Sequence, residues 1–158
     1  AETIRHFCSD CVADEIIEPQ FAYWMKPEIY PDTFPFIRAF ESVPVYILSN
    51  IDTAHIVSAI GYHRIPVTGV ITSEDVRAYK PRPELFAEAL NRYRLKPDEV
   101  IHIGDSITSD VKGAGHLGIK TVWLNRLGKR KPEGIEPDYV CRDLTEVRQM
   151  LMREFEWN

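Results

Sequence analysis

The sequence predicts an α/β protein in which a parallel, Rossmann-like sheet is flanked by helices. Short runs of β-branched and apolar residues alternate with segments whose apolar residues recur at helical spacing. Several of these runs end in glycine or polar residues, as strands do when they carry side chains to a ligand site. The alternation from strand to helix and back indicates right-handed crossovers between parallel strands.

The individual elements follow from these patterns. Residues 1–30 are typical of helix, punctuated by Pro19, Pro27 and Pro31, and Asp32 or Thr33 is expected to cap a helix that runs through Phe40. The expected strands are residues 43–48, 67–71, 100–103, 121–124 and 139–141. The expected helices are residues 53–60, which Gly61 should stop, and residues 83–93, 111–117 and 144–155.

Composition limits the classes of function. The chain has 158 residues, 44% of them apolar, which is the size of one globular domain. A net charge of −5 and a single short basic triplet, residues 129–131, disfavour nucleic-acid binding. No run is long and apolar enough for a membrane span or a signal peptide, so a cytoplasmic protein is expected.

The three cysteines do not indicate a disulfide framework, because an odd number cannot pair completely within one chain. Cys8 and Cys11 form a lone C-x-x-C close to His6. A zinc or redox site would need further ligands at suitable spacing, so helix packing is the preferred interpretation of these residues.

Two aspartates, Asp105 and Asp110, follow the strand-like residues 100–103. At the carboxyl end of a parallel strand they would face a ligand site, and two carboxylates close together repel unless a cation lies between them. A hard divalent ion suits them best, so they predict a magnesium site. In the alternative interpretation, Asp105 caps the following turn and Asp110 caps the helix of residues 111–117.

Two other strand or loop ends are polar. Ser49 and Asn50 follow an apolar strand, where a hydroxyl and main-chain N–H groups can donate to a phosphate, although Ser-Asn is also a common helix start. Lys80 precedes Pro81 at a helix entrance, where proline restricts the backbone and so holds the lysine in a defined place. An ordinary surface lysine is the alternative.

Taken in order, these residues resemble the haloacid dehalogenase superfamily of phosphatases. The segments that carry the resemblance are residues 47–50, the family's second motif; residues 80–86, its third; and residues 104–110, its fourth, with a typical continuation at 113–115 and 118–126. The resemblance implies that Ser49 binds the phosphoryl group, with Asn50 supporting the pocket. It also implies that Lys80 neutralises nucleophile and phosphate, and that Asp105 and Asp110 hold Mg²⁺.

The family's first motif, an apolar strand ending in D-x-D that supplies the nucleophile, has no counterpart in this sequence, where no two aspartates lie two residues apart. By resemblance, residues 1–30 are the remnant of a small helical cap and residues 31–158 are an incomplete core. The missing strand would lie between the strands that end at Ser49 and at Asp105. An empty slot would leave roughly ten backbone groups unpaired, at about 1–3 kcal/mol each if buried. We therefore expect another segment to fill it: an N-terminal piece of the same protein, a second copy, or a distinct partner chain.

The expected function is Mg²⁺-dependent hydrolysis of a small phosphorylated metabolite through an aspartyl phosphate, with this chain alone nearly inactive. Two alternatives remain open. One is a metal-independent 2-haloacid dehalogenase, and the other is an inactive module that binds a phosphorylated ligand or a protein through the same pocket.

Overall fold

The computed structural model describes residues 13–155 of the chain. Its five strands are β1 (Tyr46–Ser49), β2 (Gly69–Thr72), β3 (Ile101–Gly104), β4 (Lys120–Leu124) and β5 (Tyr139–Cys141). All strand pairs are parallel and their order follows the crossovers expected from the sequence. The predicted α/β fold, with parallel strands flanked by helices, is confirmed. His6, Cys8 and Cys11 lie outside the described residues.

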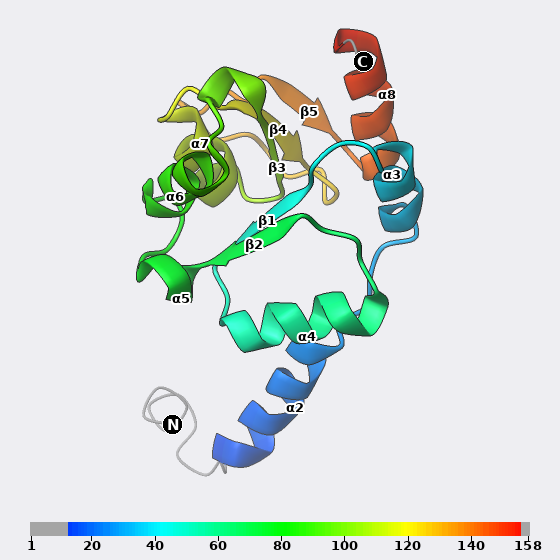
Figure 1. Cartoon of the computed structure of the whole chain (residues 1–158), viewed down its shortest axis with the longest axis vertical. Coiled ribbons are helices and arrows are strands. Elements are labelled where there is room, and N and C mark those ends of the chain that lie inside the picture. The colour runs from blue at the N-terminus through cyan, green and yellow to red at the C-terminus, as the bar shows by residue number, and fades with distance from the viewer. Residues whose placement is uncertain (1–12, 156–158) are drawn as a thin grey trace.

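The strands form two separate sheets. β1 pairs with β2, with Ser49 opposite Thr72, and β4 lies between β3 and β5. Within residues 13–155, β1 and β3 are not hydrogen-bonded to each other. Figure 1 shows the two sheets side by side with the edges of β1 and β3 facing each other.

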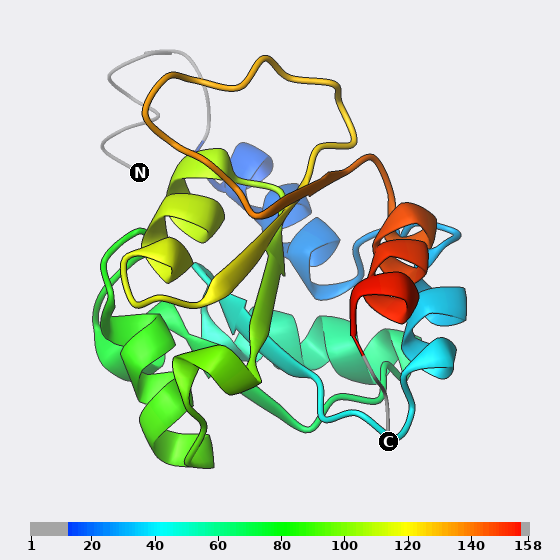
Figure 2. The ribbon, with the colours of Figure 1, turned by 90° about the horizontal axis from the view of Figure 1, so that it is seen from above.

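Helices cover both faces of these sheets (Figure 2). On one face α3 (Thr33–Ala39) and α8 (Leu144–Glu154) pack against the three-stranded sheet, in a core that includes Val122 and Val147, both fully buried. On the other face α6 (Glu84–Tyr93) and α7 (Gly113–Gly115) pack through a second core centred on Phe86. Short α5 (Ser73–Val76), η1 (Pro97–Glu99) and η2 (Ile107–Lys112) complete the connections.

The first described helix, α2 (Ala13–Met25), lies apart from the sheets and packs against α4 (Thr53–His63). Figure 1 shows it extending away from the α/β part of the molecule. Its ring contacts join Phe21 and Trp24 to His55 of α4, with ring centroids 5.1 and 5.6 Å apart. The division of the chain at residue 30 into cap remnant and core stays a prediction.

Three local expectations are wrong. α2 continues through Pro19, which lies inside the helix and does not break it. α4 continues past Gly61 to His63, and its C-cap residue Arg64 adopts the left-handed conformation at φ 53°. An interior glycine costs a helix only about 1 kcal/mol relative to alanine, so it does not oblige the helix to stop. The helix expected at residues 111–117 begins earlier, as η2 at Ile107.

β1 and β3, which face each other across the gap between the two sheets, are less buried than β4. β4 has neighbours on both sides, and its Thr121, Val122 and Trp123 are 2%, 0% and 2% exposed. Every residue of β1 and β3 is only half-buried. No helix in the part of the chain that the structure describes has the length and apolar character needed to cross a membrane.

Candidate functional site

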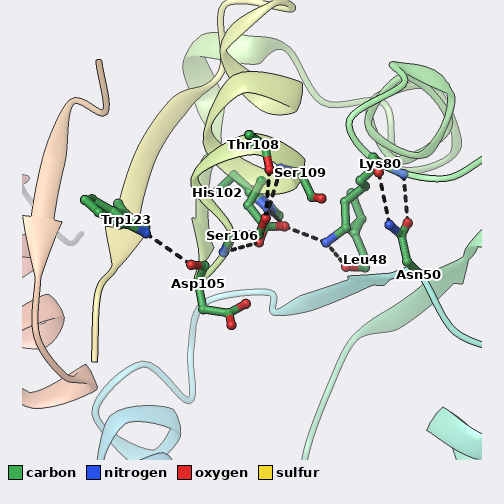
Figure 3. A network of polar contacts seen from close by, with 10 residues as sticks. Leu48, Asn50, Lys80, His102, Asp105, Ser106, Thr108, Ser109 and Trp123 are labelled. Carbon is green, nitrogen blue, oxygen red and sulfur yellow. Dashed lines mark hydrogen bonds and ion pairs between the residues drawn. The ribbon is translucent and has the colours of Figure 1, made fainter. Parts of the chain in front are cut away.

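The candidate site lies where β1 and β3 end. β1 ends at Ser49 and is followed by Asn50, while β3 ends at Gly104 and is followed by Asp105. Lys80 reaches this edge from the loop between α5 and α6 (Figure 3). Residues as far apart in the sequence as Ser49 and Asp105 thus lie at the same edge, because parallel strands place their carboxyl ends on one side of a sheet.

Lys80 connects the two sheets. Its Nζ donates to the main-chain oxygen of Leu48 in β1 at 2.8 Å and to Oδ1 of Asp110 in η2 at 2.6 Å. The side chains of Lys80 and Asp110 are only 10% and 7% exposed, so this ion pair is largely desolvated. The structure therefore brings together Lys80 and Asp110, two residues that the sequence analysis assigned to the site.

Asp110 accepts further hydrogen bonds. His102 Nε2 lies 3.1 Å from Oδ1, and the main-chain N–H of Ser106 donates to Oδ2 at 3.0 Å. Burial alone would raise the pKa of Asp110, but the His102 hydrogen bond and the Lys80 charge outweigh it and lower the pKa to about 2. Asp110 is therefore an anion at neutral pH, and its charge keeps the Lys80 ammonium in place.

Gly104 allows Asp110 to approach the strand. A Cβ atom at residue 104 would lie 2.2 Å from Cγ of Asp110, closer than atoms can pack. The helical turn that carries Asp110 is started by Ser106, whose hydroxyl accepts from the N–H of Ser109 at 3.1 Å. The alternative interpretation of the two aspartates as caps is therefore wrong, because Ser106 is the cap and Asp110 lies inside η2.

Asn50 holds the main chain of Lys80. Its Oδ1 accepts from the Lys80 N–H at 2.8 Å and its Nδ2 donates to the Lys80 carbonyl at 3.1 Å. The peptide bond between Lys80 and Pro81 is cis. Asn50 was expected to support the phosphate pocket, and in the structure its amide is engaged by Lys80. Ser49 is half-buried at the end of β1, one residue beyond the carbonyl that binds Lys80 Nζ.

Asp105 faces a different part of the site. It is exposed, and Figure 3 shows that it joins the drawn network only through its main-chain oxygen, which accepts from Trp123 Nε1 at 3.1 Å. Asp105 lines a cavity of about 370 Å³ on the α3 and α8 side, together with Tyr30, Asn125, Arg126 and other residues.

The surroundings of Asp105 and Asp110 show how well each carboxylate could bind a magnesium ion. Asp105 has an exposed carboxylate, which suits a hard cation, whereas both Asp110 oxygens already accept hydrogen bonds from Lys80, His102 and Ser106. Within residues 13–155 no three acidic, histidine or cysteine side chains cluster closely enough to hold a metal ion. The described residues thus offer one suitable ligand, and a complete site would need others.

A second ion pair anchors the cavity wall. Arg126, which follows β4, donates to both carboxylate oxygens of Asp32 at 2.9 and 3.0 Å, and its guanidinium lies 4.0 Å from the ring centroid of Tyr30. Burial opposes ionisation of Asp32, but hydrogen bonds from Arg126 and from the Leu144 N–H lower its pKa below the usual value. This contact fixes the segment before α3 against the end of β4.

His102 is a residue of the candidate site that the sequence analysis missed. It belongs to β3, its ring lies edge-on to Phe86 at 5.0 Å between centroids, and it contacts the same Asp110 oxygen as Lys80. The pattern of residues 100–103 predicts a buried apolar strand and assigns no role to its histidine. The available signal was a histidine between two isoleucines, because a polar side chain at a half-buried strand position needs a hydrogen-bond partner.

The comparisons with known proteins agree with this architecture. The family model described as haloacid dehalogenase-like hydrolase matches residues 4–118. A glyceraldehyde 3-phosphate phosphatase from Pyrococcus furiosus is 37% identical over 89 residues, covering 54% of this chain and 37% of that protein. An (S)-2-haloacid dehalogenase from a Pseudomonas species is 31% identical over 84 residues, covering 52% of this chain and 37% of that protein.

The crystal structure of a haloacid dehalogenase-type phosphatase from Thermococcus onnurineus superposes with a TM-score of 0.72 at 32% identity, covering 90% of this chain and 65% of that one. The chain thus spans between about a third and two thirds of the length of these relatives. The family match covers most of the chain and includes β1, Lys80 and the β3 end. The chain therefore belongs to the haloacid dehalogenase-like hydrolases.

Proposed function

We propose that this chain forms the phosphate-binding part of a magnesium-dependent phosphatase that acts on a small phosphorylated metabolite. The observation that supports this most is the position of Lys80. Its ammonium group is held by Leu48 and Asp110 at the carboxyl ends of two parallel strands. An ammonium group has three donors, so Lys80 can bind one further acceptor, such as a phosphoryl oxygen.

The proposed roles of the other residues follow from charge. Phosphoryl transfer is catalysed mainly by positioning and by neutralising charge on the phosphoryl oxygens. Lys80 supplies a positive charge, and Asp110 positions the Lys80 ammonium group. Ser49 supplies a hydroxyl donor at the end of β1. Asn50 acts through Lys80, because its amide is bonded to the Lys80 main chain.

Among residues 13–155, Asp105 is the residue that would bind magnesium. The bound ion would supply further positive charge to the phosphoryl oxygens. Asp110 was expected to be the second ligand, but its engaged oxygens support a role in which it acts on the phosphoryl group through Lys80. The remaining protein ligands would come from outside residues 13–155.

The nucleophile is proposed to come from a segment that fills the gap between β1 and β3. In the first step the first aspartate of the D-x-D motif on this segment attacks phosphorus, the P–O bond to the substrate breaks, and the leaving oxygen takes a proton from the second aspartate. In the second step water attacks the aspartyl phosphate and gives a proton back to the second aspartate, which releases phosphate and regenerates the first carboxylate. The separate sheets and the half-buried β1 and β3 support such an insertion. The inserted segment could come from an N-terminal piece of the same protein, from a second copy or from a distinct chain.

Binding and turnover test this proposal separately. Calorimetry with magnesium and inorganic phosphate should show binding to the 158-residue chain that Lys80→Met removes and the exposed Arg82→Met does not. Turnover of p-nitrophenyl phosphate by the chain alone should be lower than that of an intact relative by on the order of 10⁶. Absence of phosphate binding would contradict the phosphatase site, and substantial turnover by the chain alone would contradict the missing nucleophile.

Two rival functions give different results. A dehalogenase would release halide from 2-haloacids without magnesium, and one relative carries that name. A binding module without activity would bind phosphate and remain inactive even when the gap is filled. Light scattering distinguishes the sources of the missing segment, because strand exchange with a second copy requires a dimer.

A further inference from the structure

Two asparagine side chains in this structure hold lysine residues in the same way. Asn50 accepts from the Lys80 N–H and donates to the Lys80 carbonyl. Asn125, which follows β4, accepts from the Lys129 N–H at 2.8 Å and donates to the Lys129 carbonyl at 2.9 Å. Each asparagine follows the end of a parallel strand, so the two lysines are both fixed at the carboxyl edge of the sheets.

Lys129 lines the cavity of about 370 Å³ that also includes Asp105. The residue after Asp105, Ser106, donates its N–H to Asp110, which in turn holds Lys80. The cavity therefore begins one residue from the Lys80 network. Within the network, Leu48 and His102 contact Lys80 and Asp110, and His102 packs against Phe86. The cavity offers open space beside the proposed phosphate-binding residues.

The chemistry of the cavity wall suits a small organic anion. Four aliphatic side chains line it, as in most sites for small molecules, namely Ile103, Leu124, Leu127 and Leu144. The charge of Arg126 is balanced by Asp32, to which it is bonded through both oxygens. Among residues 13–155 no carboxylate forms an ion pair with Lys129, whereas the nearby Lys131 pairs with Glu136. Lys129 and Asp105 are thus the charged residues of this wall without an ion-pair partner among residues 13–155. With magnesium bound at Asp105, as proposed above, the wall would carry a net positive charge.

We propose that this cavity binds a second anionic group of the substrate, a carboxylate or another phosphate, and that Lys129 selects for it. The inference rests on the proposed function and extends it. It narrows the proposed substrates from small phosphorylated metabolites to those that carry a second negative charge, separated from the phosphoryl group by a short carbon chain. Asn125 is a positioning residue, since it fixes the main chain from which the Lys129 side chain extends.

Calorimetry with two inert probes tests this inference on the 158-residue chain in the presence of magnesium. Methylphosphonate carries only the phosphonate, whereas phosphonoacetate adds a carboxylate on a short carbon linker. A charge-assisted contact with Lys129 should make phosphonoacetate bind about tenfold more tightly. Lys129→Gln should remove this preference, and the exposed neighbour Arg130→Gln should retain it. Phosphonoacetate can bind magnesium in solution, but this effect is the same for every protein variant. It therefore cancels when variants are compared with the same probe.

Each outcome has a distinct meaning. Loss of the preference in Lys129→Gln alone supports the inference. Equal affinity for the two probes, or an unchanged preference in Lys129→Gln, overturns the inference and leaves the proposed function standing. Failure of both probes to bind overturns the proposed function and this inference with it. Thermal unfolding of both variants, which change exposed side chains, checks that the fold is retained.

Discussion

The two sheets differ in how their strands are completed. In the three-stranded sheet β4 has neighbours on both edges and three of its residues are at most 2% exposed. Among residues 13–155, β1 of the two-stranded sheet pairs with β2 alone, and none of the β1 residues is fully buried. β3 resembles β1 in this respect, because it has one neighbour and no fully buried residue. β2 and β5 also have one neighbour each, but both contain buried residues. The two strands without a buried residue are therefore β1 and β3, which face each other across the gap between the sheets (Figure 1).

The candidate site belongs to neither sheet alone. Ser49 and Asn50 belong to the two-stranded side, and Asp105 and Asp110 to the three-stranded side. Lys80 is bonded to both sides, through Leu48 and Asp110. The contacts that hold the ammonium group are thus also contacts between the sheets, and changes at the site should alter stability as well as binding.

The largest effect is expected from Lys80→Met, which removes the link between the sheets. Asp110 would remain buried without its cation, and breaking a buried ion pair in this way costs about 3–5 kcal/mol. Chemical denaturation would measure the free energy of unfolding. Arg82→Met is the matched control, because Arg82 is 68% exposed and its solvent-screened pair with Glu84 should contribute little to stability. Equal losses in the two variants would show that Lys80 does not join the sheets.

The Lys80–Asp110 ion pair should also make the stability of the fold depend on pH, because Asp110 must be ionised for the pair to form. The pKa of Asp110 is lowered from 3.8 to about 2 in the folded chain, so folding favours the ionised carboxylate. This contribution, about 2 kcal/mol, is complete above the unfolded pKa near 4 and is lost as the pH falls towards 2. Asp110→Asn should show a shallower loss of unfolding free energy over this window.

Asp32 also has a lowered pKa and adds to the acid sensitivity of the wild type. The informative quantity is therefore the difference between wild type and Asp110→Asn, in which the Asp32 contribution cancels. Parallel curves for the two proteins between pH 4 and pH 2 would contradict the proposed state of Asp110.

A smaller loss is expected from Gly104→Ala, which places a methyl group where Asp110 packs. Overpacking of this kind costs about 1–3 kcal/mol and should displace Asp110 from Lys80. Gly115→Ala is the matched control, because a Cβ there has no atom within 4 Å. Thermal unfolding would compare them, and a Gly104→Ala protein as stable as Gly115→Ala would show that Asp110 can move without cost.

The sequence predicted the sheets better than the site. Strand positions were predictable because β-branched runs such as residues 100–103 are local signals, and Asp110 and Lys80 were recognised from their motifs. The partners of these residues could not be predicted in the same way. Whether Asp110 contacts Asp105, Lys80 or His102 depends on side-chain directions at two strand ends, and these are set by tertiary packing around Gly104 and η2.

The smallest effect concerns Asn50, which acts on Lys80 from the two-stranded side. Its two hydrogen bonds are at an exposed position, so Asn50→Ala should cost about 1 kcal/mol. If Asn50 stabilises the fold by placing Lys80, the double variant with Lys80→Met should lose less than the sum of the single losses. Asn125→Ala combined with Lys80→Met is the control pair, because Asn125 holds Lys129 and the losses should add. Additive losses for the Asn50 pair as well would mean that Asn50 stabilises its loop independently of the contact between the sheets.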